Sequence, residues 1–410
     1  MIELLAPAGD MEKLKTAVHF GADACYFAGK KFGLRAMSTN FTEEELKEAI
    51  EYLHKHNKKG YITLNIVAHN VDFDGLSEYV LYLESIGADG VIVSDIGIIT
   101  LIRRIAPNLP VHVSTQANIT NKHTAKFYCD LGVTRLVLAR ELSAKEIKEI
   151  RDYIPEEVEI ETFVHGAMCI SYSGRCLLSN YLTNRDSNRG ACVQACRWEY
   201  TITEKSRKGT DGYEIQEDDR GTYILNSKDM NLIEHIDKLV DAGIMSFKIE
   251  GRMKSPYYVA TVINAYRRAI DSYLSSNKQG KCYNCEGCLT HELEKTSHRR
   301  YTTGFMFGDK NKECLESSMP VQTHEFMAKV IGENENGYVL IEQRNRFKVG
   351  ETLEVLSPDE NFNKEIKVVE MKNLKGENVD DALRVQDQLY LKTDLKLKPG
   401  DILRKEIEVK

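Results

Sequence analysis

The chain has 410 residues, of which 42% are hydrophobic and 29% are charged, an ordinary composition for a soluble globular protein. No uninterrupted apolar run approaches the roughly 18 residues that a membrane-spanning helix needs, so we predict no membrane role. The formal net charge of -7 argues against a generic nucleic-acid coat, which would be basic overall, yet it allows a local basic patch that contacts RNA.

The amino-terminal residues 1–7 (MIELLAP) read as a β-strand and lack the basic region and apolar core of a signal peptide. We therefore expect a cytoplasmic protein. Ten cysteines in that compartment indicate metal or redox chemistry rather than disulfides.

Short β-branched runs alternate with longer helical patterns over residues 1–250, which is typical of βαβ units and a parallel sheet. Eight segments fit strands: Glu3 to Leu5, Ala24 to Phe27, Tyr61 to Asn65, Gly90 to Ser94, Val111 to Ser114, Arg135 to Ala139, Val158 to Val164 and Met245 to Glu250. Eight such repeats predict an α/β fold, a closed (β/α)8 barrel of the TIM type.

Helix ends support this division. Two capping boxes, Thr42 with Glu45 and Ser143 with Glu146, stand at the head of amphipathic runs. Four glycines stand where helices should end in a left-handed C-cap residue before the next strand: Gly21, Gly87, Gly132 and Gly243.

The connection between the seventh and eighth strands is overlong. It spans about 80 residues, far beyond the usual 2 to 6 of a βα loop, and we assign residues 166–243 to an insertion within a barrel domain of residues 1–320. Residues 200–204 and 223–226 are predicted strands of an exposed hairpin at its end. Short strands and turns after residue 320 predict a small C-terminal β-barrel domain, residues 321–410.

Four cysteines lie close together inside this insertion: Cys169, Cys176, Cys192 and Cys196. Such density in an intracellular chain indicates a metal or iron–sulfur site. Structural zinc usually uses tight cysteine pairs, and only Cys192 with Cys196 has that spacing, so we favour a [4Fe-4S] cluster and keep zinc as the alternative metal. Buried free thiols are the remaining interpretation.

A second group, Cys282, Cys285 and Cys288, has the C-x2-C-x2-C spacing of a metal-binding loop. It lacks an adjacent fourth ligand, which Cys314 or His291 could supply. A small metal site and chance thiols both stay open here.

Polar residues stand at several predicted strand ends, where (β/α)8 enzymes carry their reactive groups. Because side chains alternate along a strand, Glu161 and His165 share one face of the seventh strand, and Lys248 and Glu250 share one face of the eighth. Other strand ends carry Gln116, Arg140 and Arg252. Each residue alone reads as a solvated loop group, but together they predict a site at the barrel mouth.

Two motifs resemble the signature of the peptidase U32 family: Glu161-x-Phe163-x-x-Gly166-Ala-Met-Cys169 and Gly174-x-Cys176-x-Leu178-Ser179. The resemblance extends over nearly the whole chain, through Ser114-Thr115-Gln116, Ala139-Arg140-Glu141-Leu142-Ser143, Lys248-Ile-Glu250-Gly251-Arg252 and Ser297-His298-Arg-x-Tyr301-x-Thr303-Gly304-Phe305. It implies a barrel with a small C-terminal β-domain.

Within the family the chain resembles a branch formerly called collagenase-like peptidases, which is tied to prephenate-dependent formation of 5-hydroxyuridine at the tRNA wobble position without molecular oxygen. The resemblance implies tRNA and prephenate as partners and a [4Fe-4S] cluster on Cys169, Cys176 and Cys192. Cys196 is the expected fourth ligand, because this chain has no cysteine near Asn226, where one relative has its last. The oligomeric state, a homo-oligomer included, is left open.

Prephenate carries two carboxylates, so Arg140 and Arg252 are candidate bidentate clamps, with Lys248 as a further cation and Gln116 as a further substrate-binding residue. Three residues are candidates for proton transfer or for contact with the polar edge of a flipped base: Glu161, His165 and Glu250.

A collagenase-like peptidase is the alternative function. The chain contains no His-Glu-x-x-His zinc helix and no Gly-x-Ser-x-Gly elbow. Cys169 or Cys176 with His165 could act as a thiol protease, but a cluster would consume both thiols. We therefore favour the iron–sulfur enzyme.

Overall fold

The computed structural model describes residues 2–33, 40–169, 171–172, 175–198, 217–218, 221–222, 228–308 and 320–407. The chain divides into two compact units. Unit 1 comprises Met1–Met11, Asp23–Met253 and Arg299–Pro320, and unit 2 comprises Glu12–Ala22, Lys254–His298 and Val321–Lys410.

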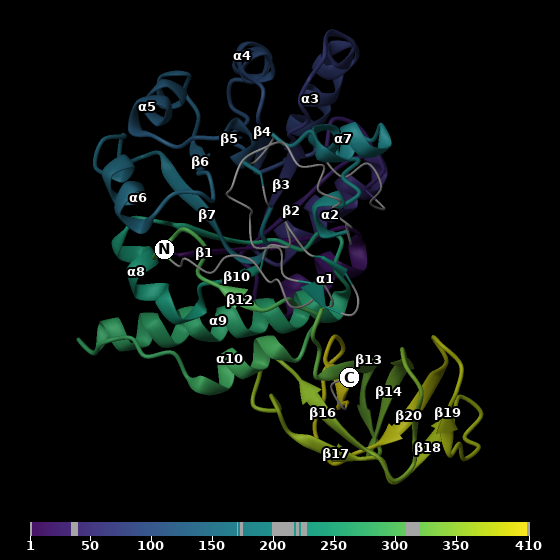
Figure 1. The fold of residues 1–410 in the computed structure, drawn as a ribbon. Coiled ribbons are helices and arrows are strands. Elements are labelled where there is room, and N and C mark those ends of the chain that lie inside the picture. Colours follow the sequence, from purple (N-terminus) through teal and green to yellow (C-terminus); the bar gives the residue numbers. More distant parts are fainter. Residues whose placement is uncertain are drawn as a thin grey trace. The chain divides into compact units, whose positions relative to one another are not determined.

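Unit 1 contains a closed barrel of eight parallel strands (Figure 1). The strands are β1 (Glu3–Pro7), β2 (Ala24–Phe27), β3 (Lys59–Leu64), β4 (Gly90–Val93), β5 (Val111–Val113), β6 (Arg135–Val137), β7 (Glu159–Ala167) and β11 (Ser246–Ile249). Each pairs with the next, and β11 closes the barrel by pairing in parallel with both β1 and β7. All eight predicted strands and the (β/α)8 class are confirmed.

Helices follow the strands: α1 (Met11–His19), α2 (Glu43–Lys55), α3 (Leu76–Ser85), α4 (Ile96–Ile105), α5 (Lys122–Asp130), α6 (Ala144–Arg151) and α8 (Ile236–Asp241). Both predicted capping boxes are present, at the starts of α2 and α6. The four predicted C-cap glycines have φ between +76° and +100°, a region that glycine adopts without steric cost. No helix among the described residues is long and apolar enough to cross a membrane.

Strand β7 continues beyond the barrel, where its end pairs antiparallel with β10 (Asp229–Asn231). Strand β10 pairs in turn with β12 (Tyr301–Thr302). The insertion therefore leaves the barrel from β7 and returns alongside it. The predicted strands at 200–204 and 223–226 lie outside the described residues, and a short pairing of β8 (Glu217–Asp218) with β9 (Gly221–Thr222) lies between them in the sequence.

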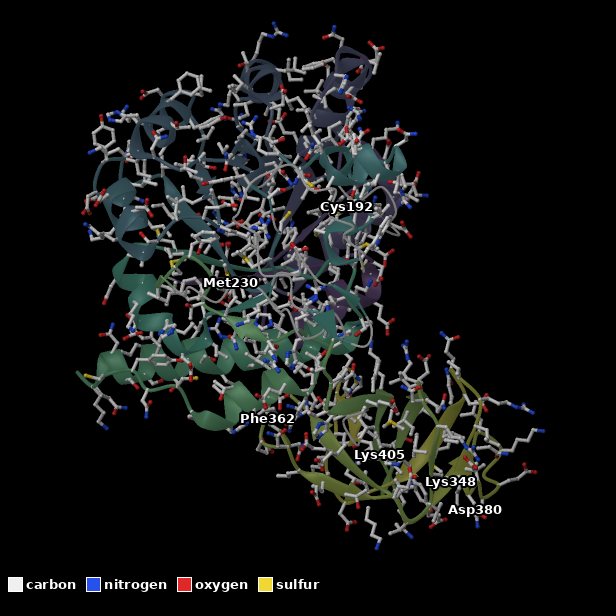
Figure 2. All side chains as sticks on the ribbon, in the orientation of Figure 1. Cys192, Met230, Lys348, Phe362, Asp380 and Lys405 are labelled. Carbon is white, nitrogen blue, oxygen red and sulfur yellow. The ribbon has the colours of Figure 1, made fainter. Side chains whose placement is uncertain are left out.

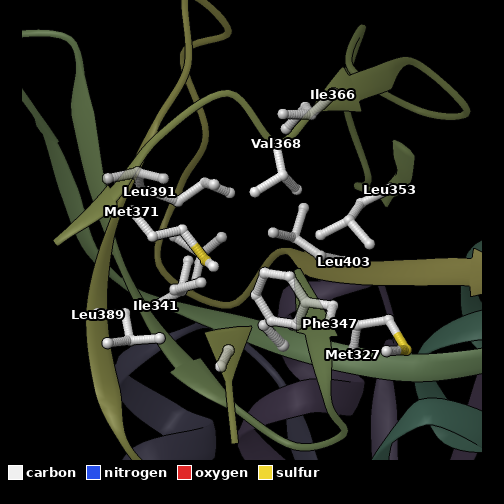
Figure 3. Packing of buried hydrophobic residues seen from close by; sticks show 14 of the residues in the cluster. Met327, Ile341, Phe347, Leu353, Ile366, Val368, Met371, Leu389, Leu391 and Leu403 are labelled. Atoms are coloured by element: carbon white, nitrogen blue, oxygen red, sulfur yellow. The ribbon is translucent and has the colours of Figure 1, made fainter. Parts of the chain in front are cut away.

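Unit 2 contains α9 (Pro256–Lys278), α10 (Gly287–Glu294) and an antiparallel half-barrel sheet in the order β17-β16-β21-β13-β14-β20-β18. Its strands are β13 (His324–Glu335), β14 (Tyr338–Gln343), β16 (Thr352–Leu356), β17 (Glu365–Lys367), β18 (Met371–Asn373), β20 (Gln388–Lys392) and β21 (Ile402–Glu406). A small pair, β15 (Phe347–Lys348) and β19 (Asp381–Ala382), accompanies it. Buried side chains such as Phe347, Leu391 and Leu403 fill its core (Figure 3), which confirms the predicted C-terminal β-structure.

A buried ion pair fixes α10 to this sheet. The guanidinium of Arg404, in β21, is fully buried and donates to both carboxylate oxygens of Glu292, at 2.5 and 2.8 Å. Its Nε also donates to Glu354 of β16 at 2.7 Å. Helix α10, which the sequence places in the barrel domain, therefore groups with the C-terminal sheet.

Candidate active site at the barrel mouth

Charged side chains fill the amino-terminal end of the barrel interior. Arg135, the first residue of β6, donates to Glu3 at 2.6 Å and to Glu161 at 3.0 Å, and it also pairs with Glu159. The Nζ of Lys248 lies 2.6 Å from Oε1 of Glu161, which is fully buried. Each buried charge thus has an opposite charge in contact, which offsets the cost of removing it from water.

The pKa of the Glu3 carboxyl reflects its pairing with Arg135. Burial by itself would raise it, but the Arg135 guanidinium and hydrogen bonds from Tyr61 and Ser246 outweigh burial and lower the pKa. The carboxylate therefore stays ionised inside the barrel.

Glu161 does not lie at the mouth, where we expected it. It is in register with Ser246, the first residue of β11, and parallel strands have their amino ends on the same side of a barrel. Its carboxylate accepts hydrogen bonds from the side chains of Arg135 and Ser246, which are the first residues of β6 and β11, so the side chain is directed to the end where these strands begin. The catalytic role of Glu161 stays a prediction, and the structure shows it as an ion-pair partner.

Two neighbouring loops form one side of the mouth. The loop after β5 contains a 3-10 turn, η2 (Thr115–Ala117), and the loop after β6 begins at Leu138. The hydroxyl of Thr115 donates to the carbonyl of Leu138 at 3.2 Å, and the Ala139 amide donates to the carbonyl of Ile119 at 3.1 Å. The loops are therefore held side by side.

Three buried oxygens in these loops have no hydrogen-bond partner among the described residues: Oε1 of Gln116, Oδ1 of Asn118 and Oε2 of Glu141. A buried acceptor left unpaired costs about 1–3 kcal/mol, so these atoms are suited to a ligand that donates hydrogen bonds. Burial raises the pKa of Glu141, against the opposing effects of its own backbone N–H and of Arg140. A carboxyl with a raised pKa near unpaired polar atoms is typical of a functional site.

The sequence identified Gln116 but not the other two as site residues. Glu141 was visible only as a polar residue after the sixth strand. No sequence pattern pointed to Asn118, because the position of its side chain depends on a left-handed backbone conformation at this turn, with φ of 57°.

The two predicted arginine clamps lie at strand ends. Nη1 of Arg140 donates to the carbonyl of Ala167 at 3.1 Å, and its guanidinium is 5.4 Å from the ring centroid of Phe163. Lys248 approaches the same ring to 5.5 Å, so both cations contact one aromatic side chain.

Arg252 is 4% exposed and donates to the Thr63 hydroxyl at 3.2 Å and to the Asn40 side-chain oxygen at 3.3 Å. These two bonds orient the guanidinium.

His165 and Glu250 are neighbours across the ends of β7 and β11. The Glu250 amide donates to the carbonyl of His165 at 2.9 Å. The His165 side chain is buried, with its ring centroid 5.4 Å from that of Tyr301. The structure thus brings these two predicted site residues together, at the point where β7 extends beyond the barrel.

The cysteine segment (residues 169–198, of which 169, 171–172 and 175–198 are described) contains contacts between its described parts. The side chains of Ser187 and Asn188 donate to the carbonyl of Cys176 at 2.7 and 3.0 Å, and helix α7 (Leu178–Thr183) contacts the turns that follow it. Figure 2 labels Cys192 next to this helix.

Arg189 fixes the cysteine segment to the loop after β3. It forms a two-bond pair with Asp72 at 2.7 and 2.8 Å and donates to the carbonyl of Val67 at 2.9 Å. Because loops that follow barrel strands form the mouth, this contact places the segment on the mouth side.

Two of the four cysteines, Cys169 and Cys192, are exposed, and Cys176 and Cys196 are partly buried. Sγ of Cys192 lies 3.4 Å from the Gln194 amide and 3.7 Å from the Ser179 hydroxyl, donors of the kind that surround thiolate ligands. Within the described ranges, no group of three or more His, Cys, Asp or Glu side chains is arranged to hold a metal ion. The donor chemistry suits a cluster, whereas the arrangement shown is not a formed four-ligand site.

The second cysteine group lies in unit 2, before and at the start of α10. Cys282 and Cys288 are exposed, and Sγ of Cys288 is directed to the Glu286 carboxylate at 3.6 Å. His291 instead contacts Glu294 at 3.2 Å, and Cys314 lies outside the described residues. Metal binding by this group stays a prediction.

Comparison with known proteins identifies the family to which this architecture belongs. Residues 9–316 match the family described as Peptidase family U32, and residues 322–404 match its C-terminal domain. The chain is 41% identical to tRNA hydroxylation protein P1 of Bacillus subtilis, over 98% of this chain and 94% of that protein. It is 36% identical to tRNA hydroxylation protein P of Escherichia coli, over 92% and 90% of the two chains.

A further relative is the 23S rRNA 5-hydroxycytidine C2501 synthase of Escherichia coli, at 35% identity over 74% of this chain and 45% of that protein. Among solved structures, the U32 peptidase Mk0906 aligns with 40% of this chain and 69% of that chain, at 18% identity and a TM-score of 0.35. On its match over most of the chain to both family domains, the protein belongs to peptidase family U32.

Proposed function

We propose that this chain is a tRNA modification enzyme that places a hydroxyl group on C5 of the wobble uridine without molecular oxygen, with prephenate as co-substrate. The observation that carries the proposal is similarity over nearly the full length to proteins named for tRNA hydroxylation. The relative named as a 5-hydroxycytidine synthase supports the same ring position on another pyrimidine.

Several groups at the mouth support this proposal. Arg140 and Arg252 would hold the two carboxylates of prephenate, since both guanidiniums stand at strand ends and are oriented by hydrogen bonds. Gln116 and Asn118 offer unpaired acceptors to the N–H of a pyrimidine. Glu141, with its raised pKa, would hold or remove a proton at that edge.

Cys169, Cys176, Cys192 and Cys196 would hold a [4Fe-4S] cluster, with zinc as the alternative metal. Such a cluster, when bound, supplies one-electron transfer. The chain's own contribution is to hold Cys192 near the Gln194 amide and the Ser179 hydroxyl, and to fix the segment to the mouth through Arg189.

The test is mass spectrometry of tRNA nucleosides in a host from which all relatives of this family are deleted. Reintroducing this chain should restore 5-hydroxyuridine derivatives, and Cys176→Ala should not. Cys129→Ala is the matched control, because Cys129 lies in α5, outside the cysteine segment, and should restore them fully. Failure of the unaltered chain to restore them contradicts the proposal.

The same proteins, purified without air, test the cluster. The unaltered chain and Cys129→Ala should be brown, and Cys176→Ala should lose the absorbance. A collagenase-like peptidase is favoured by one relative, the Porphyromonas gingivalis protein named Collagenase, at 34% identity over 75% of this chain. Cleavage of denatured collagen by colourless protein would support that alternative and overturn the main proposal.

A further inference from the structure

Unit 1 contains a pocket that the proposed reaction does not use. It has a volume of about 290 Å³ and lies between the loop after β2 and the first turns of α2 and α3. Its walls include Phe41, Leu46 and Tyr79. The volume is close to the lower end of the range for small-molecule sites, about 300 Å³.

The buried hydroxyl of a tyrosine lines this pocket. Tyr79 is 5% exposed, and its OH finds no hydrogen-bond partner among the described residues. Burial, with help from the nearby Glu43 and Tyr82, raises the pKa of Tyr79, so the hydroxyl keeps its proton and can donate. An unpaired buried hydroxyl is costly in free energy, which is explained if a ligand accepts from it.

Gly29 makes room for that hydroxyl. A Cβ atom at position 29 would stand 2.2 Å from the Tyr79 OH, closer than two such atoms can approach. The close contact fixes the ring at the pocket wall, where the Phe32 ring also packs against it at 5.3 Å between centroids.

The charges around the pocket are balanced. Lys30 and Lys31 face Glu43 and Glu44, and Lys31 pairs with Glu43 at 3.7 Å. The N-terminus of α2 is already capped by Thr42 and Glu45. A free phosphate is therefore a poor match. A flat ring with polar edges is a better one, because the apolar walls would stack on it, Tyr79 would donate to it and the carboxylates would accept from it.

The pocket is on the same side of the barrel as the cysteine segment. Tyr79 is in the first turn of α3 and Glu43 begins α2, and barrel helices start on the mouth side. The loop that leads into α3 carries Asp72, the residue that holds the cysteine segment through Arg189. A strand of RNA at the mouth would therefore pass this pocket.

We propose that the pocket receives an unstacked base of single-stranded RNA next to the modified nucleotide, with Lys30 near the adjoining phosphate. This inference rests on the proposed function, since it takes RNA as the substrate. Base stacking combined with one cation is the usual way in which proteins hold single strands.

The decisive variant is Tyr79→Phe, which removes only the hydroxyl. Binding of a tRNA anticodon stem-loop, measured by fluorescence anisotropy, should weaken about fivefold, the scale of one lost hydrogen bond. Thermal stability should be unchanged or raised, because an unpaired buried polar group is gone. An unchanged Kd would overturn the proposal.

Tyr82→Phe is the matched control. Tyr82 lies one turn further along α3, and its hydroxyl already donates to the carbonyl of Glu43. Its removal should lower stability and leave the Kd for the stem-loop unchanged. Equal weakening by both variants would show a general effect on α3 and contradict the proposal.

Two further measurements define the ligand. Lys30→Gln should weaken binding about twofold and reduce the salt slope by about one, and an unchanged slope would contradict a phosphate next to Lys30. Uridine monophosphate should compete only weakly; strong, Tyr79-dependent binding of it would show a mononucleotide site instead and overturn the RNA assignment.

Binding is measured without turnover, so the two proposals fail separately. Loss of Tyr79-dependence with intact tRNA hydroxylation overturns the pocket alone. Tyr79-dependent RNA binding with no effect on nucleoside composition overturns hydroxylation alone. No RNA binding by the unaltered chain overturns both.

Discussion

The two ends of the barrel interior differ in whether their buried polar groups have partners. At the amino-terminal end, Glu3, Arg135, Glu161 and Lys248 are buried or nearly so, and each contacts an opposite charge. At the mouth, buried oxygens of Gln116, Asn118 and Glu141 have no partner within the described part of the chain. The first arrangement is complete without a ligand and the second is not, so we predict a structural role for the first and a functional role for the second.

The comparison is most strongly tested by Arg135→Leu. It should lower the free energy of unfolding by about 3–5 kcal/mol, because it leaves Glu3 and Glu161 buried with one cation fewer. Urea denaturation measures this. Lys126→Gln is the control, because its pair with Asp130 on the surface of α5 is exposed and should contribute less than 1 kcal/mol. A similar small loss in both variants would show that the charged network is not structural.

At the mouth, Glu141→Gln should lower activity and leave stability nearly unchanged, in contrast to Arg135→Leu. We expect nucleoside hydroxylation to fall about 100-fold, or about 2.7 kcal/mol of transition-state stabilisation. Stability should be equal or slightly higher, since the ionised form of Glu141 is disfavoured by burial. Glu149→Gln, on the exposed face of α6, should change neither property. Full activity in Glu141→Gln would remove this residue from the site.

The smallest effect is on the pH dependence of stability. The folded-state pKa of Glu3 is lowered, so its stabilisation is present above the unfolded pKa, about 4.3, and is lost as pH falls through the folded pKa. The pKa of Glu141 is raised, so stability declines as pH rises from about 4.3 to the raised value.

Glu3→Gln should therefore lose less stability on acidification than the unaltered chain. Glu141→Gln should gain relative to it only above about pH 4.3. Unfolding free energies across this pH range measure both changes. Parallel profiles for all three proteins would contradict the assignment of opposite environments.

Local sequence signals determined most of the fold. Short apolar runs that alternate with helical patterns identified all eight barrel strands, because this alternation is the local mark of βαβ units. Capping boxes and glycines with positive φ defined helix ends, because these preferences act over only a few residues. Family motifs located the cysteine segment and the strand ends around it.

Tertiary structure decided the rest, because it depends on contacts between residues far apart in the chain. Packing of β7 between β6 and β11 directed the Glu161 carboxylate to Ser246 and gave it Arg135 and Lys248 as partners. Long-range packing joined α10 to the C-terminal sheet through Arg404. It also left the Tyr79 hydroxyl beside Gly29 with no hydrogen-bond partner in the described part of the chain. A sequence shows that a charge is present, but whether its partner is another residue or a ligand depends on what the fold brings within a few ångströms.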